Sequence, residues 1–203
     1  LRINTQNIMK TNEKAYAKNV KNFITYKKLD RVILLGNSLG GHIGLYHAKM
    51  YPEKMAGLII TGSSGLYESA MGDSYPRRGD YEYIRRKAEE VFYDPKIATK
   101  EIIDEVYEMA NDRIKLIKTL TIAKSAIRHN MAKDLPKMHV PTCIIWGKND
   151  KVTPPEVANE FHDKLPNSSL YWIDNCGHAA MMEHPDEFNT IMYEWLQRAN
   201  LKI

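Results

Sequence analysis

Short apolar runs alternate with stretches of helical periodicity along most of the chain. The apolar runs are flanked by charge, glycine or proline and have the length of buried strands; they span residues 31–36, 57–61, 141–146 and 169–173. The intervening stretches repeat their apolar residues at helical spacing; they span residues 15–29, 39–50, 155–165 and 185–198. Strands that alternate with helices are typical of parallel βαβ units. The sequence therefore predicts an α/β fold with a mostly parallel sheet flanked by helices.

The pattern changes between about residues 62 and 138, where long, charged helices replace the strands. The clearest of these helices is predicted for residues 101–127. Its apolar residues lie along one helix face; they are Ile102, Ile103, Val106, Ala110, Ile114, Ile117 and Leu120. The sequence thus predicts a layer of strands and helices that is interrupted by a helical insertion.

The composition is that of a folded protein. Of the 203 residues, 43% are hydrophobic and 27% are charged, and no apolar run approaches the roughly 18 residues of a membrane span. The 29 basic and 25 acidic residues are interspersed and leave a net charge of +4, so neither nucleic acid nor a membrane is expected as a partner. Cys143 and Cys176 lack a CxxC spacing, which predicts free thiols and a cytoplasmic protein.

The most informative motif is G-x-S-x-G at residues 36–40, directly between a predicted strand and a predicted helix. This is the context of a nucleophile elbow, in which glycines permit a sharp turn that exposes the serine hydroxyl. Ser38 is the candidate nucleophile, and the amide of Leu39 points to where an oxyanion would form. A turn that binds phosphate, or that only reverses the chain, is the alternative. A P-loop is excluded because no Lys-Ser or Lys-Thr follows the glycines.

A serine nucleophile needs a base, and the base needs a carboxylate that orients it. Asp150 follows the third predicted strand, and His178 follows the fourth. The order Ser, Asp, His is the one expected for this elbow, and all three residues lie at the carboxyl ends of strands. Considered singly, Asp150 is expected to be a turn or helix-cap residue, and His178 is expected to be a solvated side chain. Their joint order and context favour a catalytic triad of Ser38, Asp150 and His178.

These blocks resemble the α/β-hydrolase superfamily. The matching blocks are residues 32–42, 141–155 and 176–188, and the resemblance extends from about residue 15 to the end of the chain. It implies Ser38 as nucleophile, His178 as general base, Asp150 as its orienting acid and Leu39 as one oxyanion amide. It also implies that residues 66–138 form a helical cap, and that residues 1–65 and 139–203 form the hydrolase core.

The resemblance implies a serine hydrolase that cleaves a small ester by acyl transfer. The serine at position 38 argues against the haloalkane dehalogenase and epoxide hydrolase branches, which use aspartate there. The form of the motifs looks most like carboxylesterases and like the carbon–carbon hydrolases of ring-cleavage products. In the latter branch tryptophan commonly follows the histidine, whereas this chain has Ala179. A small-molecule ester is therefore the expected substrate, and a ketone cleaved at a carbon–carbon bond is the alternative.

Further candidates carry weaker signals. Trp146 and Met182 are candidates to line an apolar acyl pocket, although either residue can equally fill the core. Arg128 is a candidate substrate contact from the insertion. His42 follows the elbow and is expected to be a packing residue. No metal-ligand spacing is present, and the proposed chemistry needs no cofactor.

The resemblance also implies elements that residues 1–14 do not supply. In the family, four strands and a helix precede the helix that corresponds to residues 15–29, and a His-Gly motif there donates the second oxyanion amide. The N-terminal strands are therefore expected to be absent from this chain, which leaves exposed sheet edges. A missing N-terminal segment or a homo-oligomer is the expected way to cover them. A non-catalytic fragment that binds a ligand or a complementing polypeptide is a further alternative.

Overall fold

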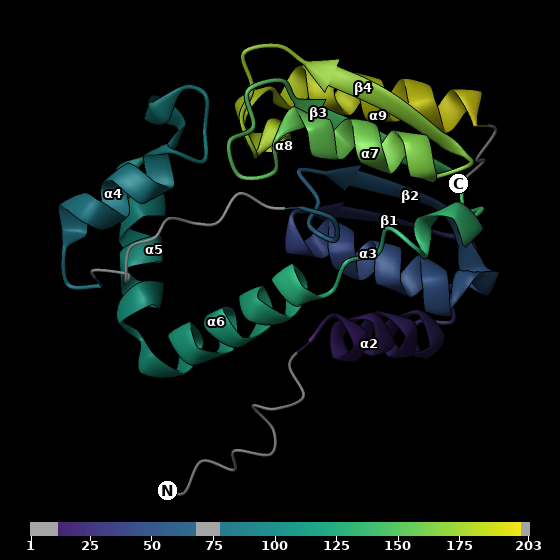
Figure 1. Ribbon diagram of the computed structural model, residues 1–203, viewed down its shortest axis with the longest axis horizontal. Helices are drawn as coiled ribbons and strands as arrows, with labels where there is room; N and C mark the ends of the chain where they lie inside the picture. The colour runs from purple at the N-terminus through teal and green to yellow at the C-terminus, as the bar shows by residue number, and fades with distance from the viewer. Residues whose placement is uncertain (1–11, 68–77, 200–203) are drawn as a thin grey trace, which may run out of the picture.

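The computed structural model describes residues 12–67 and 78–199. Four strands and eight longer helices follow one another along these residues, in the order α2 (Glu13–Tyr26), β1 (Val32–Asn37), α3 (Leu39–Met50), β2 (Met55–Thr61), α4 (Tyr81–Glu89), α5 (Lys100–Asn111), α6 (Arg113–Arg128), β3 (Thr142–Gly147), α7 (Pro155–Lys164), β4 (Ser168–Ile173), α8 (Ala180–Glu183) and α9 (Pro185–Arg198). Short 3-10 turns at Pro52–Lys54, Pro95–Ile97 and Leu135–Lys137 connect some of them. The expected α/β fold is confirmed (Figure 1).

The described strands form one parallel sheet in the order β1-β2-β3-β4. The registers align the last residues of neighbouring strands: Asn37 pairs with Thr61, and Gly147 pairs with Ile173. Because all four strands run in the same direction, the loops that follow them meet at one edge of the sheet. Ser38, Asp150 and His178 all lie in or at the start of these loops.

The side chains of the central strands alternate between two cores, as expected for a sheet buried on both faces. Leu58 and Ile144 pack with α3 and α7 on one face, where Leu45 and Phe161 are buried. On the other face, Ile59 and Cys143 pack with α8 and α9; the buried residues there also include Ile145, Ile173, Phe188 and Trp195. This two-sided cover explains why β3 is buried along its whole length.

The predicted helix over residues 101–127 is wrong as a single element, because two helices meet at Asp112. The Asp112 backbone is extended, and its Oδ1 accepts hydrogen bonds from the amides of Ile114 and Lys115. Aspartate at an N-cap stabilises the start of a helix, so Asp112 ends α5 and begins α6. The expected apolar face is also divided: Ile103 is buried, whereas the α6 residues Ile114, Ile117 and Leu120 are 40–47% exposed.

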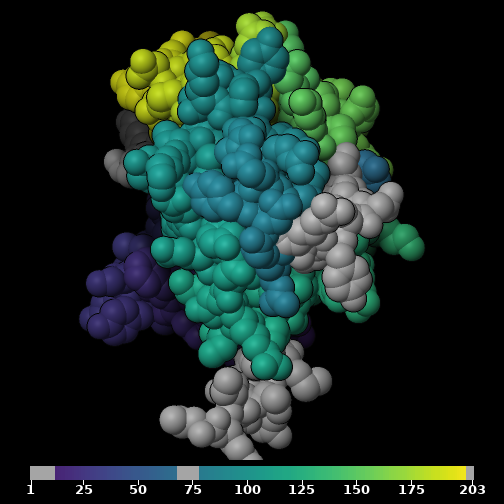
Figure 2. Space-filling view, turned by 90° about the vertical axis from the view of Figure 1, so that its left-hand side faces the viewer, coloured from purple at the N-terminus to yellow at the C-terminus, as the bar shows by residue number. Residues whose placement is uncertain are grey.

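Helices α4, α5 and α6 extend from the strand ends as a separate group, and Figure 2 shows them covering one side of the molecule. The α4–α5 part has its own small core, which includes Phe92 and Ile103. Ala179, the residue after the candidate histidine, belongs to this same cluster. The insertion therefore packs directly on the loop that carries His178.

Candidate active site

Ser38 occupies a strained turn between β1 and α3. Its φ of 53° lies in the left-handed region, which costs a non-glycine residue about 1–3 kcal/mol. The turn is fixed by its main chain: the Ser38 amide donates to Thr61 O over 3.0 Å, and the Ser38 carbonyl accepts from the amide of Ser64 over 3.2 Å. A side chain at Gly36 would collide with the Gly40 backbone, so Gly36 permits this close approach.

Asp150 and His178 form a buried pair at the neighbouring strand ends. Asp150 Oδ2 lies 2.9 Å from His178 Nδ1, and the two side chains are 0% and 8% exposed. Asp150 Oδ1 accepts hydrogen bonds from the amides of Val152 (2.8 Å) and Thr153 (2.9 Å). A carboxylate held by main-chain amides keeps a fixed direction, so it can orient the imidazole ring.

The loop that carries His178 is attached to the rest of the site through its main chain. The His178 amide donates to Val91 O over 2.9 Å, which links it to the insertion. The His178 carbonyl accepts from Asn37 Nδ2 over 3.0 Å, and the same Nδ2 donates to Thr61 O over 3.1 Å. Gly62, at a φ of 49°, lies against the imidazole, where a Cβ would be 2.8 Å from Nδ1.

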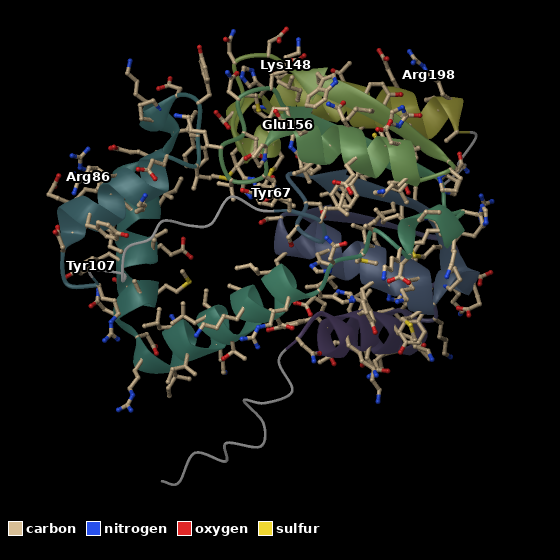
Figure 3. The ribbon with its side chains drawn as sticks, viewed as in Figure 1. Tyr67, Arg86, Tyr107, Lys148, Glu156 and Arg198 are labelled. Atoms are coloured by element: carbon tan, nitrogen blue, oxygen red, sulfur yellow. The ribbon has the colours of Figure 1, made fainter. Side chains whose placement is uncertain are left out.

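The loops after β3 and β4 are also joined to each other. The amides of Lys148 and Asn149 donate to Ile173 O (3.0 Å) and Cys176 O (2.9 Å). Lys148, which lies at the strand ends in Figure 3, forms an ion pair of 2.6 Å with Asp174. Both of these side chains are at least half exposed, so the main-chain bonds contribute more to the loop geometry than the ion pair does.

The structure brings Asp150 and His178 into direct contact and places Ser38 at the end of β1 in the same sheet. Among the residues that the structure describes, no hydrogen bond joins Ser38 Oγ to the His178 ring. The connection runs instead through Asn37, the residue before the serine, and the carbonyl of His178. Leu39 is the first residue of α3, where helix amides have no partner within the helix and are available to an anion.

Trp146 and Met182 differ in their exposure. Trp146 is completely buried, and its Nε1 donates to Thr153 O over 2.9 Å. Trp146 therefore fills the core beside Phe161 and offers no open surface to a substrate. Met182 lies on the short helix α8 after the histidine loop and is 43% exposed.

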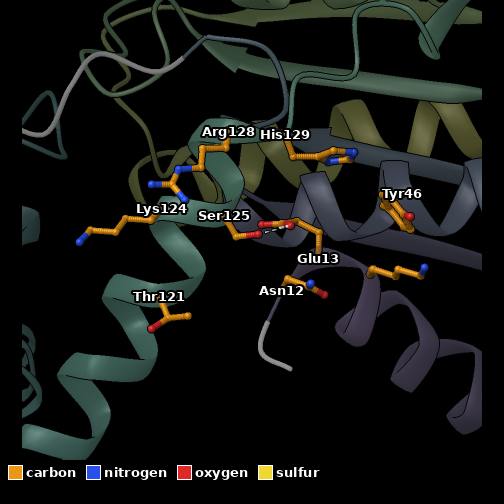
Figure 4. Close-up of a pocket in the computed structure, with 9 residues that line it drawn as sticks. Asn12, Glu13, Tyr46, Thr121, Lys124, Ser125, Arg128 and His129 are labelled. Carbon is orange, nitrogen blue, oxygen red and sulfur yellow. Dashed lines mark hydrogen bonds between the residues drawn. The ribbon is translucent and has the colours of Figure 1, made fainter. Parts of the chain in front are cut away.

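Arg128 lines a cavity of about 530 Å³ between α2, α3 and α6 (Figure 4). Its wall includes Lys124, His129 and Glu13, whose Oε2 accepts from Ser125 Oγ over 2.8 Å. None of the three triad candidates lines this cavity. Arg128 thus lies close to the junction of α6 with the core.

His42 is buried on α3 and pairs with His129 at the end of α6. His42 Nε2 lies 2.8 Å from His129 Nδ1, and Ser64 Oγ lies 3.5 Å from His42 Nδ1. Burial, together with the neighbouring His129, lowers the pKa of His42 to about 3. His42 is therefore neutral at ordinary pH, as expected of a packing residue, and the pair joins the insertion to the elbow helix.

Cys143 and Cys176 are both free and buried, and burial raises the pKa of each thiol to about 12. Within residues 12–67 and 78–199, no group of three His, Cys, Asp or Glu side chains is arranged to hold a metal ion.

In the same part of the chain, no helix is both long and apolar enough to cross a membrane.

A family model described as serine aminopeptidase, S33, matches residues 11–185. The chain belongs to this family of α/β hydrolases. A solved α/β hydrolase from the metagenome of sediments of the Mar Chica lagoon, Morocco, is 53% identical to it, with a TM-score of 0.75 over 95% of this chain and 73% of that one. The α/β-hydrolase family implied by the sequence motifs is thereby confirmed.

Two curated relatives of this hydrolase are named as hydrolases of 2-hydroxy-6-oxo acids. The 2-hydroxy-6-oxononadienedioate/2-hydroxy-6-oxononatrienedioate hydrolase of a Pseudomonas species is 27% identical over 94% of this chain and 72% of the relative. The 2-hydroxy-6-oxo-6-(2'-aminophenyl)hexa-2,4-dienoic acid hydrolase of Metapseudomonas resinovorans is 30% identical over 89% of this chain and 65% of the relative. The chain thus spans 65–72% of the length of these two relatives.

Proposed function

We propose that this chain carries the catalytic triad of a serine hydrolase, with Ser38 as nucleophile, His178 as general base and Asp150 as the orienting acid. The observation that carries the proposal is the buried contact of 2.9 Å between His178 and Asp150, next to a serine held at positive φ. This combination provides an oriented base and a half-buried serine hydroxyl at the carboxyl ends of the strands.

In the proposed reaction, His178 Nε2 takes the proton of Ser38 Oγ as the oxygen attacks a carbonyl carbon. The Leu39 amide at the start of α3 supports the oxyanion, together with the helix dipole. Collapse of this intermediate breaks the bond to the leaving group, which takes the proton from His178. Water, deprotonated by His178, then attacks the acyl carbon. The bond from this carbon to Ser38 Oγ breaks, Oγ takes the proton back from His178, and the acid is released.

We propose a carbon–carbon bond of a 2-hydroxy-6-oxo-dienoate as the bond that is cleaved. The names of the two curated relatives support this substrate class over the small ester expected from the motifs. The leaving group is then a carbon atom of the dienoate, which takes the electron pair and is protonated. A small ester is the second candidate, because acyl transfer is common to both reactions and Ala179 occupies the position where the carbon–carbon branch commonly has tryptophan.

Residues 66–138 are proposed as the cap of this site, and residues 1–65 and 139–203 as the core. The hydrogen bond of the His178 amide to Val91 and the packing of Ala179 with Phe92 support a cap that contacts the catalytic loop. A cap in this position limits the access of water and shapes the acyl pocket.

Turnover of the two substrate classes tests the proposal. The parent is expected to convert a 2-hydroxy-6-oxo-dienoate to two acids faster than it hydrolyses p-nitrophenyl butanoate, as measured by mass spectrometry and absorbance. Ser38→Ala is expected to lose at least about a thousandfold of the rate on either substrate. Ser169→Ala, on the edge strand β4, is the matched control and is expected to keep the parent rate. Equal turnover by Ser38→Ala would refute the triad, and faster turnover of the ester would favour the second candidate.

A further inference from the structure

Thr153 is completely buried between Asp150 and His178. Its Oγ1 lies 2.8 Å from Asp150 Oδ2 and 3.2 Å from His178 Nδ1. Its own backbone is fixed at both polar atoms, because the amide donates to Asp150 Oδ1 over 2.9 Å and the carbonyl accepts from Trp146 Nε1 over 2.9 Å. The hydroxyl is therefore held at the junction of the acid and the base.

The positions of the protons follow from these contacts. An anionic Oδ2 at 2.9 Å from Nδ1 requires a proton on Nδ1, because two lone pairs would otherwise face each other. The Thr153 hydroxyl has one proton, which it donates to Asp150 Oδ2 at the shorter distance. Its lone pairs then face the Nδ1 proton, which is shared between Oδ2 and Oγ1 as a three-centre bond. This arrangement leaves the lone pair on Nε2, where the base needs it.

We infer that Thr153 is a positioning residue, whose hydroxyl holds His178 in the Nδ1-protonated form and moderates the charge that Asp150 presents to it. The inference rests on the triad proposed above and adds a fourth member that does not touch the substrate. The sequence alone did not point to Thr153, because the residue follows Asp150 in an ordinary loop.

Two further acidic side chains near the His178 loop have partners of their own. Asp174 pairs with Lys148 over 2.6 Å. Glu183, on α8, accepts hydrogen bonds from the amides of Gly177 (2.8 Å) and Tyr93 (2.7 Å). The neighbours of His178 from the β1 and β2 ends are Asn37 and Gly62, which carry no charge. Asp150 is thus the charged group in contact with the ring, and Thr153 acts on that same carboxylate.

Thr153→Val removes the hydroxyl and keeps the shape of the side chain. The substitution removes the hydrogen bond that Thr153 Oγ1 donates to Asp150 Oδ2 over 2.8 Å, and it removes the oxygen that lies 3.2 Å from His178 Nδ1. The bond to the charged carboxylate is the shorter and stronger of the two, so its loss has the larger effect. Asp150 then holds the protonated imidazole more strongly. The acidic limb of the pH–rate profile is expected to move to higher pH. The rate at neutral pH should fall about tenfold, and most of the lost rate should return at alkaline pH. KM for p-nitrophenyl butanoate should be unchanged.

Three measurements test this role. The pH profile of the rate is compared for the parent, Thr153→Val, Thr153→Ser and the control Thr190→Val, which removes an exposed hydroxyl that donates to Asp186 O on α9. The NMR resonance of the His178 Nδ1 proton is compared in the same four proteins, without substrate. Thermal unfolding of each protein separates loss of structure from loss of rate. Thr153→Ser and Thr190→Val should match the parent, whereas Thr153→Val should shift both the profile and the resonance.

An unmoved acidic limb and an unshifted resonance in Thr153→Val would overturn the inference, as would an equal change in Thr153→Ser. If Ser38→Ala keeps the parent rate, the proposed function fails, but the NMR comparison still tests Thr153 because it needs no turnover. The two failures are therefore distinguishable.

Discussion

The side chain of Asn37 donates a hydrogen bond of 3.0 Å to the main-chain carbonyl of His178. The residue that precedes the elbow serine therefore holds the loop of the candidate base, across 141 positions of sequence. The same amide group also binds Thr61 O at the end of β2, so Asn37 connects three strand ends. This bond links the candidate nucleophile to the loop of the candidate base without involving the side chain of either residue.

Replacement of Asn37 by alanine is expected to lower kcat about tenfold, because the His178 loop loses its link to the elbow and the base is less well placed. The fold should remain, since Asn37 is only partly buried. Steady-state kinetics on p-nitrophenyl butanoate measures the effect. Asn167→Ala removes a longer, exposed amide bond of 3.4 Å to His139 O and is the control. Equal rates for both variants would contradict this account.

Gly62→Ala is expected to displace the imidazole of His178. The φ of 49° at this position costs a residue with a Cβ about 1–2 kcal/mol. The alanine Cβ would also clash with two atoms of the imidazole ring, which lie within 2.9 Å of it. The rate should fall by more than about tenfold. Gly79→Ala is the matched control, because a Cβ there meets no atom within 4 Å. Full activity of Gly62→Ala, measured alongside a melting curve, would show that the ring is placed by other contacts.

The buried His42 is expected to make the fold sensitive to acid. Because burial and His129 lower its pKa from 6.5 to about 3, the unfolded chain binds a proton between these values that the folded chain does not. The free energy of unfolding should therefore fall as the pH falls from 6.5, by up to about 1.4 kcal/mol per pH unit. Urea unfolding at several pH values measures this slope. His42→Gln, which lacks the titrating ring, should show a shallower slope, and parallel curves would contradict the assignment.

The fold was largely predictable from the chain, because buried parallel strands are short apolar runs. The periodicity gave the bounds of α3 and α9 as the structure has them, 39–50 and 185–198. The single helix predicted over 101–127 failed because periodicity does not detect a cap. Asp112 stands between two segments of similar pattern, and its side-chain bonds to the first amides of α6 decide where one helix ends.

The site was predictable only in part. Ser38, Asp150 and His178 could be proposed from the sequence because each follows a predicted strand, and the structure shows the contact between Asp150 and His178. The contacts of Thr153 and Asn37 with His178 were not predicted, because they depend on side-chain contacts between segments that no spacing reveals. A signal was present for Asn37, which adjoins the serine. The position of Arg128 in a separate cavity could not be inferred, since it depends on how α6 meets α2 and α3.

The central claim is that Ser38 is a nucleophile activated by His178, and covalent labelling by a fluorophosphonate tests it most directly. Intact-mass measurement of the parent should show one adduct, and peptide mapping should place it on Ser38. His178→Ala should slow labelling by at least about a thousandfold, and Ser38→Ala should abolish it. Failure of the folded parent to form the adduct, or an adduct on another residue that persists in Ser38→Ala, would contradict the account.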